Sequence, residues 1–181
     1  MKRQPIAILD ACVLVPMPLA DTLLRLAEPE ALFGARWTDR ILAEVTRTLE
    51  TKFAKSPEKA RYREQAIREY FPVALVHHYE PRITEMTNHP KDRHVLAAAI
   101  ECKADYLVTF NLKDFVTPPS SSRLPTIVGP STFLKQLWSL DRLEFDRRLR
   151  QQADAIGMSV EHLLDRLANA VPTFVESIRS S

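Results

Sequence analysis

The chain alternates short apolar runs with longer amphipathic stretches. Residues 6–9 are apolar and end at Asp10, which is typical of a buried strand. From Ile41 to Phe53 apolar side chains recur every four positions, which is the spacing of one helix face, and Thr38 is suited to begin that helix. The same patterns predict strands at 6–9, 73–76, 106–110 and 126–128, and helices at 21–27, 38–54, 57–71, 92–103 and 132–140.

Helices separate most of the expected strands, and this arrangement favours parallel pairing in an α/β fold. After Asp141 the chain carries strongly charged or amphipathic helical segments, interrupted by Gly157 and Pro172. We therefore expect an α/β domain over residues 1–140 and a helical extension over residues 141–181. The extension either docks on the core of its own domain or binds a partner.

The composition limits the kinds of ligand-binding site that the chain can contain. The chain is 45% hydrophobic and 27% charged, as in ordinary globular proteins, and its net charge of +2 does not by itself indicate nucleic-acid binding. It has three glycines, of which the nearest two, Gly129 and Gly157, are 28 residues apart. This excludes glycine-rich phosphate loops, so any phosphate must be held by side chains or metal ions.

No targeting or membrane signal is evident. The apolar run at 6–9 is shorter than a signal-peptide core, and no run approaches the ~18 apolar residues of a membrane span. Cys12 and Cys102 lie in apolar stretches and are expected to be free thiols in a reducing compartment. We expect a cytoplasmic protein without a membrane partner.

Three acidic residues stand beside the apolar elements. Asp10 ends the first strand, Glu44 borders the apolar face of the helix at 38–54, and Asp92 begins a buried helix. Each also has an ordinary structural interpretation, as a turn residue, a surface glutamate or a favourable charge at a helix N-terminus.

Two further polar residues follow the strand at 106–110, and both Asn111 and Asp114 are of types that favour turns. If this strand neighbours the first, their oxygens converge with Asp10 and Asp92 at the carboxyl edge of the sheet. Several carboxylates in one cleft either raise one another's pKa or require a cation, and hard oxygen ligands favour Mg²⁺ or Mn²⁺.

Other chemistries fit less well. The cysteines lack C-x-x-C spacing and the histidines form no H-x-x-x-H pair, so no zinc site is predicted, and His94 is expected to be a surface or packing residue. A phosphotransferase with an aspartyl nucleophile would suit Asp10, but its common form has a second acid two residues later, where this chain has Cys12.

Four segments carry these residues: ILDACV at 8–13, ILAEV at 41–45, KDRHVLAAA at 91–99 and LVTFNLKDF at 107–115. In this order the chain resembles the PIN-domain ribonucleases found as VapC toxins of bacterial toxin–antitoxin pairs, over about residues 5–135. The resemblance implies a PIN-like three-layer α/β/α sandwich with a short central parallel sheet, and metal-dependent cleavage of RNA.

The resemblance also implies roles for individual residues. Asp10 and Asp92 would be the principal Mg²⁺ ligands, Glu44 would complete the acidic cluster directly or through water, and Thr109 would support the pocket by hydrogen bonding. One departure is Asn111, where many relatives have Asp. Either Asn111 or Asp114 would fill the fourth position, and the number of ions stays open. The candidate catalytic residues are Asp10, Glu44, Asp92, Asn111 and Asp114.

The implied reaction is hydrolysis of a phosphodiester by a water molecule that a divalent cation activates, leaving a 5′-phosphate and a 3′-hydroxyl. A cognate antitoxin and a homodimer are the implied protein partners. The alternative is a catalytically weak or silent PIN-like module that acts through protein or RNA binding, which Asn111 favours and the retained acids oppose. The cationic residues expected to guide RNA are Arg40, Arg47, Lys91, Arg93 and Lys113.

Overall fold

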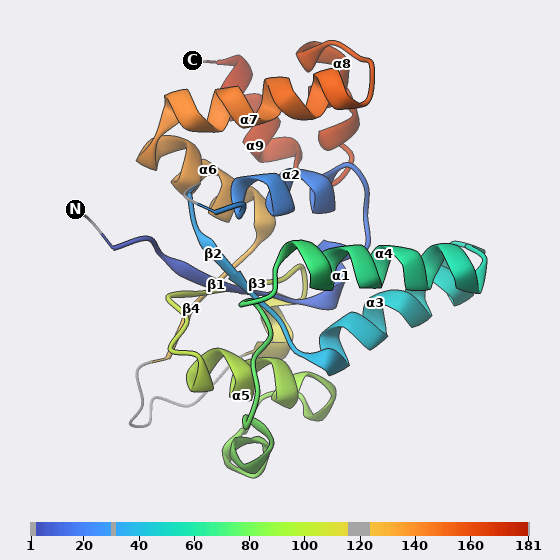
Figure 1. Ribbon diagram of the computed structural model, residues 1–181. Coiled ribbons are helices and arrows are strands. Elements are labelled where there is room, and N and C mark those ends of the chain that lie inside the picture. The colour runs from blue at the N-terminus through green and yellow to red at the C-terminus, as the bar shows by residue number, and fades with distance from the viewer. Residues whose placement is uncertain (1–2, 30–31, 116–123, 181) are drawn as a thin grey trace.

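A computed structural model describes residues 3–29, 32–115 and 124–180 (Figure 1). Within these ranges four parallel strands form one sheet in the order β2-β1-β3-β4, so the chain is an α/β protein as predicted. Ile8 in the central strand β1 pairs with Arg36 on one side and Leu107 on the other. The strands are β1 (Ile6–Leu9), β2 (Gly34–Arg36), β3 (Tyr106–Val108) and β4 (Thr126–Val128).

Helices cover both faces of this sheet (Figure 1). Helix α5 (Arg93–Glu101) packs on one face against β1 and β3, and five of its residues from Val95 to Ala99 are almost fully buried. On the opposite face Phe133 of α6 (Pro130–Leu140) contacts Tyr106 of β3, with ring centroids 5.4 Å apart. The three-layer arrangement follows from this pattern. The remaining N-terminal helices are α1 (Ala11–Leu14) and α2 (Leu19–Leu26).

One predicted strand is wrong. Residues 73–76 form no strand, and only Leu75 makes an isolated bridge, to Trp37. The strand that pairs with β1 at this edge is instead β2 at Gly34–Arg36, a segment too short and too polar to show an alternating pattern. The predicted loop at 117–125 lies mostly outside the described residues.

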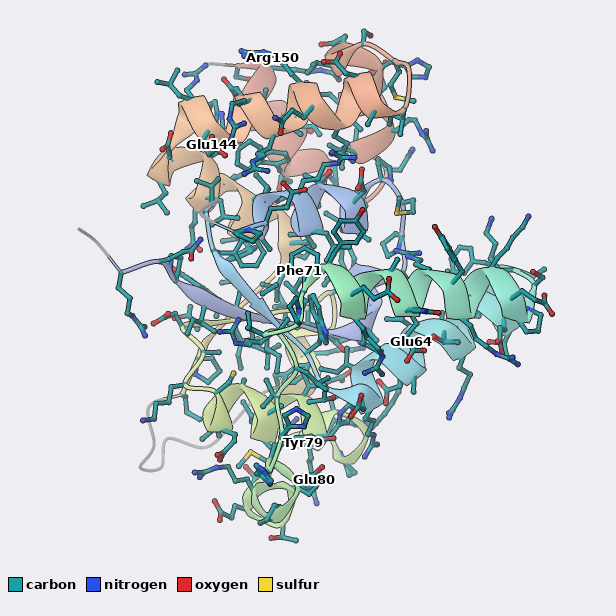
Figure 2. The ribbon with its side chains drawn as sticks, in the orientation of Figure 1. Glu64, Phe71, Tyr79, Glu80, Glu144 and Arg150 are labelled. Atoms are coloured by element: carbon teal, nitrogen blue, oxygen red, sulfur yellow. The ribbon has the colours of Figure 1, made fainter. Side chains whose placement is uncertain are left out.

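Helices α3 (Asp39–Lys52) and α4 (Pro57–Tyr70) form a hairpin that projects from the sheet (Figure 1). The Thr38 hydroxyl accepts a hydrogen bond from the backbone N–H of Ile41 and so begins α3, as its position predicts. At the base of the hairpin, the ring of Phe71 meets Trp37 edge to face at 5.6 Å, and Figure 2 shows Phe71 directed toward the sheet. The short 3₁₀ turns are η1 (Glu80–Glu85), η2 (Pro90–Asp92) and η3 (Leu112–Phe115).

The C-terminal helices pack on the domain itself. Helix α7 (Arg142–Ala155) lies on α2, and α9 (Pro172–Arg179) lies on α6, with α8 (Val160–Leu167) between them in the chain. The buried side chain of Gln152 joins α7 to α2: Thr22 Oγ1 donates to its Oε1 at 2.8 Å. Its own Nε2 donates to the carbonyl of Pro18 at 3.2 Å.

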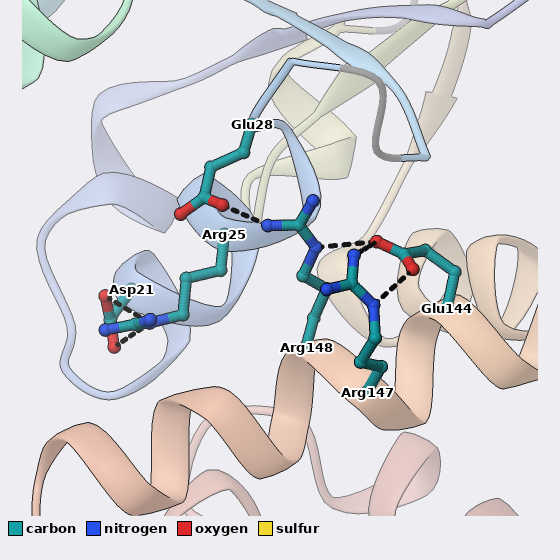
Figure 3. Close-up of polar contacts among 6 residues, drawn as sticks. All are labelled: Asp21, Arg25, Glu28, Glu144, Arg147 and Arg148. Atoms are coloured by element: carbon teal, nitrogen blue, oxygen red, sulfur yellow. Dashed lines mark hydrogen bonds and ion pairs between the residues drawn. The ribbon is translucent and has the colours of Figure 1, made fainter.

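Ion pairs reinforce the same contact (Figure 3). Arg148 of α7 pairs with Glu28 at the end of α2 and with Glu144 one turn earlier, at 2.7 Å for the second pair. Of the two alternatives for the extension, the structure shows docking on its own domain. A division into two domains at residues 140 and 141 stays a prediction. None of the described helices is long and apolar enough to cross a membrane.

Candidate functional site

Asp10 and Thr109 meet at the carboxyl ends of β1 and β3. The backbone N–H of Asp10 donates to the carbonyl of Val108 at 3.1 Å, so the two strand ends stay side by side. Thr109 Oγ1 donates to Asp10 Oδ2 at 2.7 Å, and both side chains are buried. The hydrogen bond is consistent with a supporting role for Thr109, and that role stays a prediction.

Cys12 is the second donor to the same carboxylate. Its thiol donates to Asp10 Oδ2 at 3.2 Å, and its sulfur accepts from the backbone N–H of Phe110 at 3.3 Å. Burial, followed by the negative charge of Asp10, raises the pKa of the Cys12 thiol to about 12. The thiol therefore keeps its proton and orients Asp10, a role that the sequence did not indicate.

Asp92 is the last residue of the turn η2, which Pro90 begins, and it directly precedes α5. It is 5% exposed, and its Oδ2 is buried without a hydrogen-bond partner among the described residues. Burial raises the pKa of Asp92, and the charges of Asp10 and Asp114 raise it further. Asp10 and Asp114 thus both act electrostatically on Asp92.

The turn after β3 is tied to this site through its backbone. The N–H of Asn111 donates to Thr109 Oγ1 at 3.0 Å, and the N–H of Asp114 donates to the carbonyl of Asn111 at 2.9 Å. The N–H of His89 donates to the carbonyl of Asp114 at 3.0 Å and so links this turn to the approach to α5. Asp114 acts electrostatically on Asp92, whereas Asn111 contributes no charge.

Glu44 lies on α3 and contacts α5 through His94. Its Oε1 lies 3.2 Å from His94 Nε2 and 3.4 Å from Arg40 Nε. Burial alone would raise the pKa of Glu44, but His94 and Arg40 outweigh it and hold the pKa below its usual value.

The carboxylate oxygens of Asp10, Asp92 and Asp114 are ligands of the type that binds a divalent cation. Among the described residues, no three His, Cys, Asp or Glu side chains are gathered tightly enough to enclose a metal ion. A buried carboxylate oxygen without a partner, at Asp92, nevertheless leaves a strong acceptor unsatisfied. Because Asp10 and Asp114 repel it, a hard cation would relieve both the repulsion and the missing contact.

The predicted RNA-contacting residues differ in their surroundings. Arg47, Lys91 and Lys113 are exposed, while Arg40 is paired with Glu44. Arg93 is half-buried, and its Nε donates to the carbonyl of Asn88 at 3.1 Å, so it has a structural contact as well.

Two buried polar residues close to Asp92 in the chain had no functional role in the sequence analysis. Of the two interpretations of His94, the structure supports packing, because this residue is 1% exposed and lies against Glu44. Asn88 is 3% exposed, with neither end of its side-chain amide hydrogen-bonded to a described residue. The apolar run that follows His94 could have indicated its burial, whereas no signal in the sequence marks Asn88.

Comparison with known proteins agrees with this geometry. The family model of the PIN domain matches residues 7–113, which include every candidate site residue except Asp114. The putative ribonuclease VapC50 of Mycobacterium tuberculosis strain H37Rv is 34% identical over 116 residues. That match covers 59% of this chain and 65% of the relative. The chain therefore spans less than two thirds of the length of the relative. No solved structure matches the chain. With the family model covering more than half of its residues and the strand-end acids in place, the chain belongs to the PIN-domain family.

Proposed function

We propose that the chain is a divalent-metal-dependent endoribonuclease that uses Mg²⁺, with Mn²⁺ as a substitute. The observation that carries the proposal is the buried Oδ2 of Asp92, which has no hydrogen-bond partner among the described residues, only a 3.9 Å contact with His89 Nδ1, and lies within electrostatic reach of Asp10 and Asp114. A pure binding module gains nothing from this arrangement, because burying repelling carboxylates costs stability. The PIN-domain match and the name of the Mycobacterium relative support nuclease chemistry.

In this proposal Asp10 and Asp92 hold the cation. Thr109 and Cys12 both donate to Oδ2 of Asp10 and so fix the orientation of its carboxylate. A bound divalent cation supplies Lewis-acid activation of water and neutralises charge on the phosphate. Asp114 or Glu44 orients the attacking water and accepts its proton, and the products carry a 5′-phosphate and a 3′-hydroxyl.

The RNA strand would approach along exposed cations beside the acids. Lys91 directly precedes Asp92, and Lys113 directly precedes Asp114, so each lies next to a proposed site residue in the chain. Three aromatic residues near the site residues in the chain differ in exposure. Trp37 and Phe115 are 1% exposed, whereas Phe110, which follows Thr109, is 43% exposed. Phe110 is therefore the aromatic ring available to stack on a base.

The similarity to a protein named VapC50 suggests an antitoxin partner, and we further propose that the chain is a toxin that acts in the cytoplasm as a homodimer. One surface suits a protein partner: a groove of about 630 Å³ between α2 and α4. Tyr62, Tyr70 and Met17 line it and are more than half exposed, although large apolar and aromatic side chains are usually covered. Size-exclusion chromatography of the chain, alone and with a candidate antitoxin, tests both partners.

The second candidate is a silent PIN-like module that binds RNA or protein without cleaving it. The specific observation that favours it is Asn111, which brings no charge to a position that many relatives fill with Asp. This candidate predicts RNA binding without products at any metal concentration.

The purified chain incubated with end-labelled RNA and Mg²⁺ or Mn²⁺, with and without EDTA, separates the two candidates. The proposal expects fragments with 5′-phosphate ends that disappear with EDTA. Cleavage that persists in EDTA, or 2′,3′-cyclic phosphate ends, would overturn hydrolysis assisted by a metal ion. Intact RNA under all metal conditions would instead favour the silent module.

A further inference from the structure

Glu44 is carried by α3, and its carboxylate must be held in place if it is to serve the site. We propose that His94 is the positioning residue that fixes the Glu44 carboxylate beside the metal-binding acids. This inference rests on the proposed metal-dependent nuclease function, and it assigns the site a residue outside the acidic set.

The first observation is burial. The side chain of His94 has no exposed surface, and its Nε2 lies 3.2 Å from Glu44 Oε1. Neither ring nitrogen has an aligned hydrogen-bond partner among the described residues, so this carboxylate is the polar contact that the structure offers the imidazole. Because a buried polar ring without a partner costs free energy, its presence here requires a compensating interaction.

The second observation is the place of His94 in the chain. Asp92 and His94 are two residues apart at the start of α5, the helix that packs on β1 and β3. Successive positions of a helix point in different directions, so one end of α5 supplies an acid on one side and an imidazole on another. The charges of Asp10 and Asp114 raise the pKa of Asp92, whereas His94 contacts Glu44 on α3.

The third observation concerns Arg40, the other residue that contacts the Glu44 carboxylate. Arg40 also lies near Glu44 Oε1, at 3.4 Å, but its side chain is 49% exposed and its ion pair is the i,i+4 type found on helix surfaces. Such a pair contributes little and is weakened by salt. His94 is rigidly buried on a different helix, so it restricts Glu44 in a way that Arg40 does not.

Helix α5 therefore has two roles in the proposed site. It places Asp92 among the strand-end acids, and through His94 it sets the side-chain orientation of Glu44 on α3. In this proposal the 3.2 Å contact with His94 Nε2 holds Oε1, and the second carboxylate oxygen of Glu44 is left for a cation or its water.

The test compares His94→Leu and His94→Gln with the unaltered chain in Mn²⁺ titrations followed by calorimetry and by the electron paramagnetic resonance of free Mn²⁺. Loss of an outer-shell partner typically lowers metal affinity about 10–100-fold, so His94→Leu is expected to weaken Mn²⁺ binding by about 10-fold. His94→Gln keeps an N–H donor and is expected to restore most of the affinity. Arg40→Gln is the matched control for the other Glu44 contact, with an expected change below about 2-fold.

A double-mutant cycle with Glu44→Gln separates positioning from general destabilisation. If His94 acts through Glu44, His94→Leu has no further effect on Mn²⁺ affinity in the Glu44→Gln background. The thermal unfolding of the metal-free variants is measured in parallel, because a merely structural role would change unfolding and leave the cycle additive.

Unchanged Mn²⁺ affinity in His94→Leu, or equal effects of this substitution with and without Glu44, would overturn the inference. In those cases the unaltered chain still binds Mn²⁺, and the proposed function stands. An unaltered chain that binds no Mn²⁺ would overturn the inference and the proposed function together.

Discussion

The hydroxyl of Thr109 donates a 2.7 Å hydrogen bond to Asp10 Oδ2 across the carboxyl ends of two neighbouring strands. Both side chains are buried, so the bond lies away from bulk water and orients the carboxylate firmly. The sequence places these residues 99 positions apart, and the parallel pairing of β1 with β3 brings them together.

Replacement of Thr109 by Val keeps the shape of the side chain and removes its hydroxyl. A hydrogen bond to a charged group contributes about 1.5–3 kcal/mol, so Thr109→Val is expected to lower kcat/KM for RNA cleavage by about 10- to 100-fold. Thr109→Ser, which keeps the hydroxyl, should stay within a few-fold of the unaltered chain. Equal activities of the Val and Ser variants would show that this bond does not orient Asp10 for catalysis.

Asp92 should destabilise the metal-free protein. Its pKa is raised in the folded state, chiefly by burial and then by Asp10, above the value near 4 of the unfolded chain. The unfolded chain therefore loses its proton first as pH rises, and the free energy of unfolding falls across this window. Above the folded-state pKa the loss is complete.

Asp92→Asn removes that loss, because the amide carries no charge. In EDTA at neutral pH its melting temperature is expected to exceed that of the unaltered chain, at about 2–4 °C for each kcal/mol regained. Added Mg²⁺ should stabilise the unaltered chain and leave the variant unchanged. A lower melting temperature for the metal-free variant would contradict the repulsion among these acids.

Gln152 should be essential for docking of the C-terminal helices. It accepts from Thr22 at 2.8 Å and donates to the carbonyl of Pro18 at 3.2 Å, with no exposed surface. Gln152→Ala removes both buried hydrogen bonds and leaves a cavity, at an expected cost of about 2–3 kcal/mol, or about 5–10 °C in melting temperature. The neighbouring Gln151 is exposed, and Gln151→Ala serves as the control with little expected change.

If Gln152→Ala melts with the control, the extension does not share the folding unit of the rest of the chain. Truncation after Leu140 gives a second measurement of the same point, because it uncovers the face of α2 that α7 packs against.

Glu144 predicts an acid-sensitive contribution to stability. Hydrogen bonds from Arg147 and Arg148 hold the pKa of this carboxyl at about 2, well below its usual value of 4.5. The stabilisation is fully present above pH 4.5 and is lost as pH falls toward 2. Since the pairs are partly exposed, the effect should be about 1 kcal/mol, and Glu144→Gln should abolish this part of the pH dependence of unfolding. Superimposable unfolding profiles for the two proteins between pH 5 and pH 2 would contradict it.

The sequence predicted the elements with strong periodicity and missed those defined by tertiary pairing. Helix α3 was foreseen because its apolar residues repeat every four positions after Thr38, and the structure begins it at Asp39. Strand β2 was not foreseen, since Gly34–Arg36 has three residues and is stabilised by its partner β1. Within residues 73–76, Ala74 and Val76 are buried while Val73 is exposed, and the segment joins the sheet only through the bridge at Leu75.

The candidate site divides in the same way. Asp10 and Asp92 follow from the expectation that strand ends and helix starts meet at one edge of a parallel sheet. The contacts of Cys12 and His94 could not be predicted, because each depends on the direction of a side chain across two elements far apart in sequence. Local pattern carries no information on such pairs.

The central claim is that the strand-end carboxylates hold the cation that cleavage requires. The most direct measurement is the Mn²⁺ affinity and the RNA cleavage rate of the unaltered chain, Asp10→Asn and Asp92→Asn, followed in the same Mn²⁺ titration. The account predicts saturable Mn²⁺ binding with cleavage that rises in parallel, and the loss of both in each variant. Cleavage that persists in either variant without Mn²⁺ binding, or Mn²⁺ binding that both variants retain, would contradict it.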